Sequence, residues 1–289
     1  MTIGAIIGPY ADYSFMRRAL VGCMLASFGS TPLGVLLVLR RMSLMGDAMA
    51  HAILPGIALG FMCAGLSVPA MSLGGLMAGF VVVVAVGLAT RFTSLREDAS
   101  LAAFYLIALA LGVILVSTHG TALDLVHLLF GSVLAIDKIS LLMIAAVTAV
   151  TLFVLAIIYR PLVVESFDPV FMRAVRGRGG VYHMVFLVLV LLNLVAGFQA
   201  LGTLMAVGLM ILPAVAARFW ARGLFPIMGI AVVLGVLASF FGLTLSYGYN
   251  VPTGPAIILV AGMLYLVSLV FGRYDSLRAR YFPFRHLEI

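Results

Sequence analysis

The strongest constraint on the fold of this chain is a series of apolar runs, each close to the length of a membrane-spanning helix. One such helix needs about 20 consecutive apolar residues, and 64% of the 289 residues are hydrophobic while only 9% are charged. Suitable runs occupy residues 17–39, 47–65, 69–90, 100–118, 139–159, 181–199, 202–220, 226–247 and 254–272. The sequence therefore predicts a single all-α, polytopic membrane domain over residues 1–289. This domain is predicted to have eight or nine transmembrane helices, because the pattern of residues 121–136 does not decide whether that segment spans the membrane.

The distribution of positive charge indicates which side of the membrane each connection faces. A formal net charge of +7 would suggest a nucleic-acid ligand in a soluble protein. Here the basic residues lie at the ends of apolar runs, so we expect no nucleic-acid partner. Connections rich in Arg face the cytoplasm, and the two richest clusters are Arg160, Arg173, Arg176 and Arg178, and Arg273, Arg278, Arg280 and Arg285. Both clusters and the tail of residues 273–289 are predicted to be cytoplasmic, whereas the side of the N-terminus stays undecided.

An aspartate and a histidine stand inside one of the apolar runs, in MSLMGDAMAHAILPG, residues 42–56. Asp47 and His51 are four residues apart, so they share one face of a helix. An ionisable group inside a membrane costs about 3 kcal/mol by insertion scales and usually faces a partner or a water-filled path. We therefore expect the pair to face a partner or a water-filled path and not lipid, either as a functional polar site or as a structural hydrogen-bonded pair.

Pro55 adds a third potential ligand to this pair. A proline cannot donate to the carbonyl four residues earlier, which belongs to His51, so a free carbonyl oxygen is predicted beside the imidazole. Imidazole suits zinc, whereas carboxylate and carbonyl oxygens suit manganese, so these groups fit a divalent transition metal. Asp124 and His127 form a secondary candidate pair for the metal, although their segment fits polar groups in a loop or at the membrane edge better.

The longest polar connection contains a predicted amphipathic helix, FDPVFMRAVRG, residues 167–177. Asp168 is expected to cap its first turn, Pro169 to occupy the first helical position and Gly177 to end it. The apolar residues follow the i, i+3, i+4, i+7, i+8 spacing of one helix face; they are Phe167, Val170, Phe171, Ala174 and Val175. Such a helix either lies on the membrane surface or fills a groove on a partner protein.

The sequence also bears on whether the chain can bind ATP by itself. It contains one lysine, Lys138, and no G-x-x-x-x-G-K-[ST] loop, the motif with which P-loop proteins hold the phosphates of ATP. We therefore predict that the chain is not an enzyme and that any ATP-driven work needs a second chain.

Five stretches of the sequence together resemble the membrane permeases of bacterial ABC importers for zinc and manganese, the ABC-3 family. They are RRMSLMGDAMAHAILPG, LREDASLAAFYLIALALGVILVS, HLLFGSVLAID, FDPVFMRAVRG and ALGTLMAVGLMILPAVAARF, and the resemblance covers about residues 15–272. It implies that Asp47 and His51 contact the metal in the translocation path and that residues 167–177 are the coupling helix for the ATPase. It also implies a multi-pass protein of the bacterial plasma membrane, surrounded by lipid and without a permanently bound cofactor. Its expected partners are an ATP-binding cassette ATPase and an extracytoplasmic metal-binding protein.

A second class of protein remains open from the sequence. A secondary transporter or channel would carry a divalent cation past Asp47 without ATP and would work as a single chain. The choice between zinc and manganese, the gate residues and the sharing of the metal site across a dimer interface also remain open. One Asp and one His supply fewer ligands than a closed zinc site, so we expect weak, transient binding. A homodimer, the commonest symmetric assembly, would double the available ligands.

Overall fold

The computed structural model describes residues 3–65, 67–93, 96–118, 133–168, 171–172 and 179–281, and all regular secondary structure in these ranges is helical. Eight helical segments in this part of the chain are long and apolar enough to cross a membrane. The predicted all-α polytopic architecture is therefore confirmed. The run at residues 202–220 forms only a 15-residue helix, α11 (Thr203–Ala217). At a rise of about 1.5 Å per residue this helix is shorter than a bilayer core.

The described helices follow one another along the chain in two halves. Those of the first half are α1 (Ile3–Asp12), α2 (Ser14–Leu39), α3 (Met45–Ala52), α4 (Leu54–Ala64), α5 (Val68–Phe92) and α6 (Glu97–Thr118). Those of the second half are the short turn η1 (Val133–Ala135), α8 (Lys138–Phe167), α10 (Gly179–Leu201), α11, α12 (Leu224–Tyr249), α13 (Thr253–Phe271) and α14 (Leu277–Tyr281). The helices α3 and α4 together form one candidate span.

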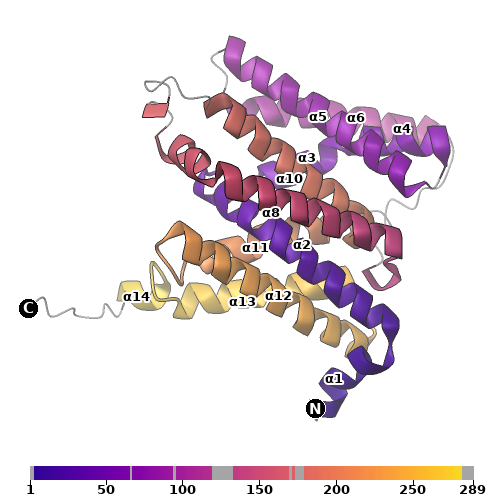
Figure 1. Ribbon diagram of the computed structural model, residues 1–289, viewed down its shortest axis with the longest axis vertical. Coiled ribbons are helices and arrows are strands. Elements are labelled where there is room, and N and C mark those ends of the chain that lie inside the picture. Colours follow the sequence, from indigo (N-terminus) through magenta and orange to yellow (C-terminus); the bar gives the residue numbers. More distant parts are fainter. Residues whose placement is uncertain are drawn as a thin grey trace, which may run out of the picture.

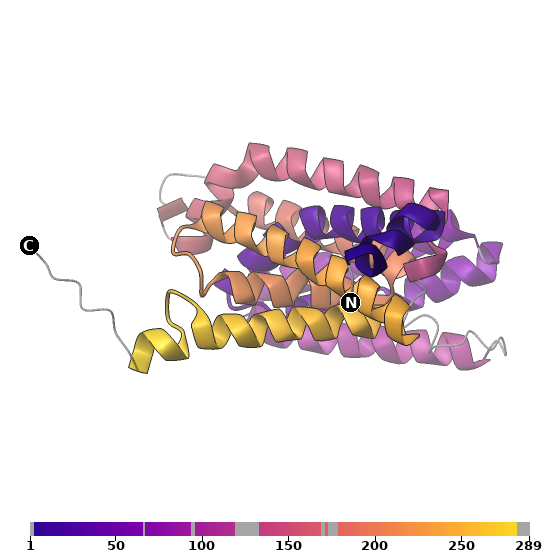
Figure 2. The same ribbon diagram turned by 90° about the horizontal axis from the view of Figure 1, so that it is seen from below.

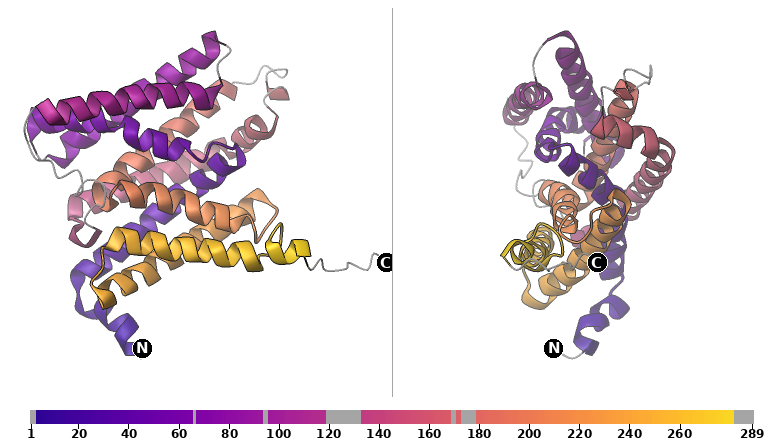
Figure 3. Two further views of the ribbon diagram at one scale, coloured as in Figure 1. Left: turned by 180° about the vertical axis from the view of Figure 1, so that it is seen from behind. Right: turned by 90° about the vertical axis from the view of Figure 1, so that its left-hand side faces the viewer.

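The spans form a bundle in which α2 and α10 are central. Figure 1 shows α4, α5 and α6 gathered on one side and α12 and α13 on the other, and the view from behind in Figure 3 shows the same order. Seen from below in Figure 2, α8 covers one face of the bundle, while α6 and α13 lie on the opposite face. Helix α2 contacts α8, α10, α11 and α12, and α2 and α10 are the most buried spans.

Several hydroxyl groups in the buried helices are satisfied within their own helix. The hydroxyl of Ser27 donates to the carbonyl of Cys23 at 2.8 Å, and that of Thr31 donates to the carbonyl of Ser27 at 2.8 Å. Ser239 of α12 makes the same bond to Gly235. Because lipid offers no hydrogen-bond partners, these bonds let polar residues sit in a membrane-spanning core.

The span formed by α3 and α4 is broken at Ile53. Pro55 has no amide hydrogen, and the next amide along the chain, that of Gly56, bonds to the carbonyl of Ile53 at 3.1 Å. The amide of Ile53 bonds to the carbonyl of Met49 at 3.3 Å. Because Pro55 offers no donor to the His51 carbonyl, the availability of that oxygen as a ligand stays a prediction.

Glycines bring α4 and α5 close to each other. A Cβ atom at Gly56 would overlap the carbonyl oxygen of Gly74, and a Cβ atom at Gly74 would overlap the carbonyl oxygen of Gly56. A Cβ atom at Gly60 would lie 2.5 Å from the carbonyl oxygen of Ala70. Small residues are what allow the backbones of membrane helices to approach in this way.

We predict that Gly74→Ala destabilises the protein, because the new methyl group forces α4 and α5 apart. The expected loss in the free energy of unfolding is about 1–3 kcal/mol, as for other overpacked interiors. Denaturant-induced unfolding in detergent micelles measures it. Gly262→Ala on α13 is the matched control, since a Cβ atom there meets nothing within 4 Å. Equal stability of the two variants would contradict the close packing of α4 on α5.

Candidate functional site

The predicted Asp47 and His51 pair lies on one face of α3, as expected from its spacing. The Nε2 atom of His51 is 3.9 Å from the Oδ1 atom of Asp47, and the side chains are 33% and 67% exposed, respectively. The imidazole also faces the ring of Tyr105 on α6, with ring centroids 6.4 Å apart. The two ionisable groups therefore stand together at an open surface between α3 and α6, while Met49 and Ala50 of the same helix are buried.

Asp47 lines a cavity of about 320 Å³ between two walls. One wall is the turn from α2 to α3 and the first turn of α3; the other is the first part of α6. The second wall contributes two further carboxylates, Glu97 and Asp98, together with Tyr105. The cavity therefore collects three carboxylate side chains, and Asp47 is the one that belongs to the histidine pair.

The carboxylates of α6 already have cationic or imidazole partners. Asp98 pairs with the exposed Arg96 at 3.1 Å, and Glu97 lies 2.7 Å from the Nε2 atom of His183. Sequence reasoning did not identify Glu97 and Asp98 as neighbours of Asp47. Their one local signal was two acidic residues at the start of an apolar run, which is also the usual way to stabilise a helix N-terminus.

The described part of the chain does not assemble a complete metal site. Within it, no group of three or more His, Cys, Asp and Glu side chains is arranged to hold an ion. Asp47 and His51 thus supply two side-chain ligands. The secondary candidates Asp124 and His127 lie outside the described residues. An arrangement with few protein ligands is open to exchange, unlike a closed structural site.

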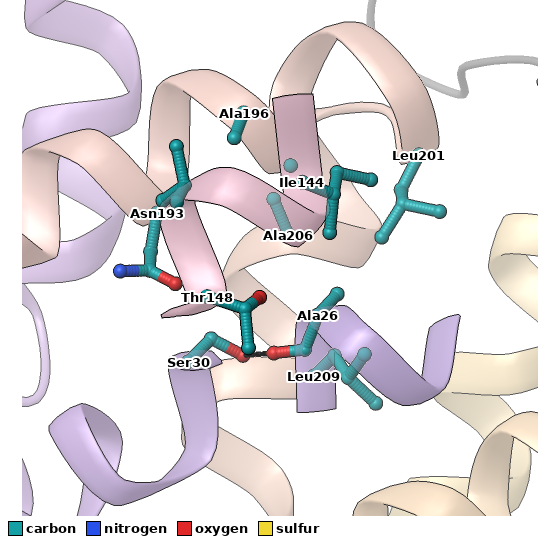
Figure 4. A pocket seen from close by; sticks show the side chains of 11 residues that line it. Ala26, Ser30, Ile144, Thr148, Asn193, Ala196, Leu201, Ala206 and Leu209 are labelled. Carbon is teal, nitrogen blue, oxygen red and sulfur yellow. Dashed lines mark hydrogen bonds between the residues drawn. The ribbon is translucent and has the colours of Figure 1, made fainter. Parts of the chain in front are cut away.

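A second polar region lies in the middle of the bundle. Figure 4 shows Ser30, Thr148 and Asn193, from α2, α8 and α10, gathered around a small cavity of about 10 Å³. The amide of Asn193 donates to the hydroxyl of Thr151 at 2.7 Å, and Thr148 donates to the carbonyl of Leu25 at 2.9 Å. None of the residues that line this cavity is ionisable. It is a polar seam that joins three helices, with room for about one water molecule.

The start of the predicted coupling helix is visible at the end of α8. The Oδ1 atom of Asp168 accepts a hydrogen bond from the amide of Phe171 at 2.8 Å, as an N-cap does. Phe167 and Phe171 are exposed, at 68% and 56%. Of the other predicted coupling residues, Pro169, Val170, Ala174 and Val175 lie outside the described residues.

These features define a polytopic membrane protein with a cavity at one end of its bundle, lined by Asp47, whose partner His51 stands beside it on the same helix face. The sequence profile of the ABC 3 transport family matches residues 12–272. The chain belongs to this family, as the resemblance of its motifs predicted.

Individual relatives are similar over nearly the whole chain. The manganese import system permease protein ScaB of Streptococcus parasanguinis is 33% identical, over 92% of this chain and 94% of its own length. The manganese transport system membrane protein MntC of Halalkalibacterium halodurans is 30% identical, over 93% and 91%. The solved structure of PsaBC from Streptococcus pneumoniae in complex with Fab matches with a TM-score of 0.84 and 29% identity, covering 97% of this chain and 100% of that chain.

We predict that a thiol at position 47 reacts with water-soluble reagents. In a chain whose Cys23 and Cys63 have been replaced by Ala, Asp47→Cys should react at least about tenfold faster with a cationic methanethiosulfonate than Ala50→Cys does, because thiol reactivity requires access. Ala50 is 2% exposed on the same helix, so it is the matched control. Equal labelling of both positions would mean that the cavity does not open to water.

Proposed function

We propose that the chain is the permease subunit of an ATP-driven importer of manganese and that the ion passes Asp47 and His51. The observation that carries this proposal is the exposed Asp47 and His51 pair in a broken membrane span, at the wall of a cavity that also holds Glu97 and Asp98. Ionisable groups at such positions belong to ion paths more often than to lipid-facing surfaces. Membership of the ABC 3 transport family and the names of the manganese permeases ScaB and MntC support the same assignment.

Manganese is favoured over zinc by the chemistry of the cavity. Its ionisable lining is mostly carboxylate, from Asp47, Glu97 and Asp98, with a single imidazole beside it. Carboxylate oxygens suit manganese, whereas zinc prefers imidazole and thiolate. The two cysteines, Cys23 and Cys63, lie on other helices.

The proposed orientation follows from the positive charges. If α11 and each of the eight spans cross the bundle once, four arginines at helix ends lie on the same side: Arg40, Arg96, Arg222 and Arg273. Arg-rich ends face the cytoplasm. We accordingly assign the cavity, the segment after α8 and the C-terminal tail to the cytoplasmic side of a bacterial inner membrane. The N-terminus, one span earlier than Arg40, is then extracytoplasmic. All of residues 1–289 form one permease domain in this assignment.

The ion is proposed to bind only in passing. A transport path must hold an ion strongly enough to admit it and weakly enough to release it, and Asp47 with His51 gives two ligands. The tight and selective step then belongs to an extracytoplasmic metal-binding protein, and no cofactor is bound permanently. A homodimer of the permease would place a second pair near the path, in keeping with the prevalence of two-fold assemblies.

The energy is proposed to come from a separate ATP-binding cassette ATPase that docks on residues 167–177. The exposed Phe167 and Phe171 supply apolar anchors for a groove on that partner. The competing class, a secondary transporter or channel, needs neither partner. Manganese uptake that depends on ATP and on the ATPase subunit distinguishes the importer from a secondary transporter and from a channel.

We predict that Asp47→Asn and His51→Ala each lower manganese uptake by at least about tenfold, because even the outer-shell partners of a metal are worth 10- to 100-fold. The measurement is ATP-dependent uptake of manganese into vesicles that hold the permease with its partner proteins, with zinc as competitor. Asp12→Asn, an exposed carboxylate on α1, is the control and should transport normally. Uptake at the normal rate in a correctly inserted double variant would remove Asp47 and His51 from the path, and zinc uptake alone would overturn the choice of metal.

We predict that Phe171→Glu weakens binding of the ATPase by about tenfold or more, because a buried aromatic anchor usually dominates an interface. Manganese binding at Asp47 should persist, while transport is lost. Co-purification and ATPase titration measure the effect, and Phe171→Leu, which keeps an apolar side chain, should bind normally. Normal ATPase affinity in Phe171→Glu would instead indicate a helix that lies on the membrane surface.

A further inference from the structure

A cluster of charged and polar side chains joins four helices near the cavity. Arg40, at the C-terminal end of α2, donates from Nε to the hydroxyl of Ser166 on α8 at 2.9 Å. Its Nη1 atom contacts the Nδ1 atom of His183 on α10. The guanidinium also lies over the ring of Phe186, 5.0 Å from its centroid. One side chain of α2 is therefore bonded to the end of α8 and to the start of α10.

The histidine extends this chain of hydrogen bonds to α6. A guanidinium carries only donors, so Arg40 donates and the Nδ1 atom of His183 accepts. The proton of the neutral imidazole is then on Nε2, which donates to the Oε1 atom of Glu97 at 2.7 Å. Arg40, His183 and Glu97 thus form one directional chain from α2 through α10 to α6.

The position of this chain connects the two regions that the proposed function requires. Ser166 and His183 lie on the two helices that flank residues 168–178, the segment assigned to the ATPase. Arg40 begins the turn into α3, and Arg41 to Asp47 of that turn and helix line one wall of the cavity. Glu97 lines the opposite wall. The helices on both sides of the coupling segment are therefore bonded to Arg40, next to one wall of the cavity. His183 is also bonded to Glu97 in the other wall.

The cluster is not fully satisfied in this arrangement. In the described part of the chain, the Nη2 atom of Arg40 and the Oε2 atom of Glu165 are buried and have no hydrogen-bond partner. Burial lowers the pKa of Arg40, an effect opposed by the carboxylates of Glu97 and Glu165. The Nη2 atom of Arg40 is an unused hydrogen-bond donor and the Oε2 atom of Glu165 is an unused acceptor. Native proteins rarely leave such buried atoms unpaired. Pairing Arg40 with Glu165 requires a shift of α8 relative to α2, so these two unpaired atoms favour movement between the two helices.

We infer that Arg40 and His183 are positioning residues that transmit movement of the coupling segment to the two walls of the Asp47 cavity. This inference rests on the proposed function, because it presumes that an ATPase acts on residues 167–177. Neither residue is assigned a direct contact with the metal. Their role is to make the spacing between α3 and α6 depend on the positions of α8 and α10.

The test is the number of manganese ions transported per ATP hydrolysed, measured in proteoliposomes that contain the whole transporter. Arg40→Gln and His183→Phe should each lower this ratio by at least about fivefold, the lower end of usual coupling between sites, while ATP hydrolysis continues. Manganese binding to the permease should be unchanged. The matched control is Arg96→Gln, which removes an exposed arginine bonded to Asp98 one residue from Glu97, and its ratio should equal that of the wild type.

The double variant Arg40→Gln, His183→Phe separates a single relay from two independent effects. In a relay, its ratio is no lower than that of the more impaired single variant, whereas two independent contributions multiply. Multiplying effects, or a wild-type ratio in Arg40→Gln, would overturn the inference. If Arg40→Gln does not assemble, Arg40→Lys keeps the charge but lacks the rigid planar fork with which Arg40 reaches Ser166 and His183, and a wild-type ratio in that variant would overturn the inference equally. Absence of ATP-dependent manganese transport in the wild type would refute the proposed function instead.

Discussion

The structure depends on one constraint, that a polar group at membrane depth must find its partner inside the protein. Most of the bundle meets it locally: the hydroxyls of Ser27, Thr31 and Ser239 bond to carbonyls of their own helices. Other polar side chains bond across a helix pair: Thr148 donates to the carbonyl of Leu25, and Asn193 donates both to Thr151 and to the carbonyl of Leu189 in its own helix. A group of ionisable side chains stands at one end of the bundle, around the cavity and Arg40.

This division explains which features the sequence could predict. The spans were predictable because length and apolarity are properties of each segment alone. The pairing of Asp47 with His51 was equally local, since a spacing of four residues fixes a shared face on any helix. The cap at Asp168 followed from the same short-range logic and is present as a hydrogen bond to Phe171.

Features that depend on contacts between helices were not predictable in this way. Glu97 and Asp98 are fifty residues or more along the chain from Asp47, and only the packing of α3 on α6 brings them to one cavity. Nothing in the sequence around His183 indicates its bonds to Arg40 and Glu97, which come from helices far away along the chain. The break near Pro55 was predictable as the loss of one donor, but the bond of the Gly56 amide to the carbonyl of Ile53 was not.

The same constraint separates holding an ion from passing it on. A site that stored a metal would surround it with ligands and close, which requires several donors from helices that are fixed relative to one another. Here the histidine pair stands on α3, the nearby carboxylates stand on α6, and those carboxylates are already engaged by Arg96 and His183. The carboxylates of α6 therefore do not close around an ion together with Asp47 and His51 in this arrangement. Because His183 is bonded in turn to Arg40, the position of Glu97 is tied to the arrangement of α2, α8 and α10.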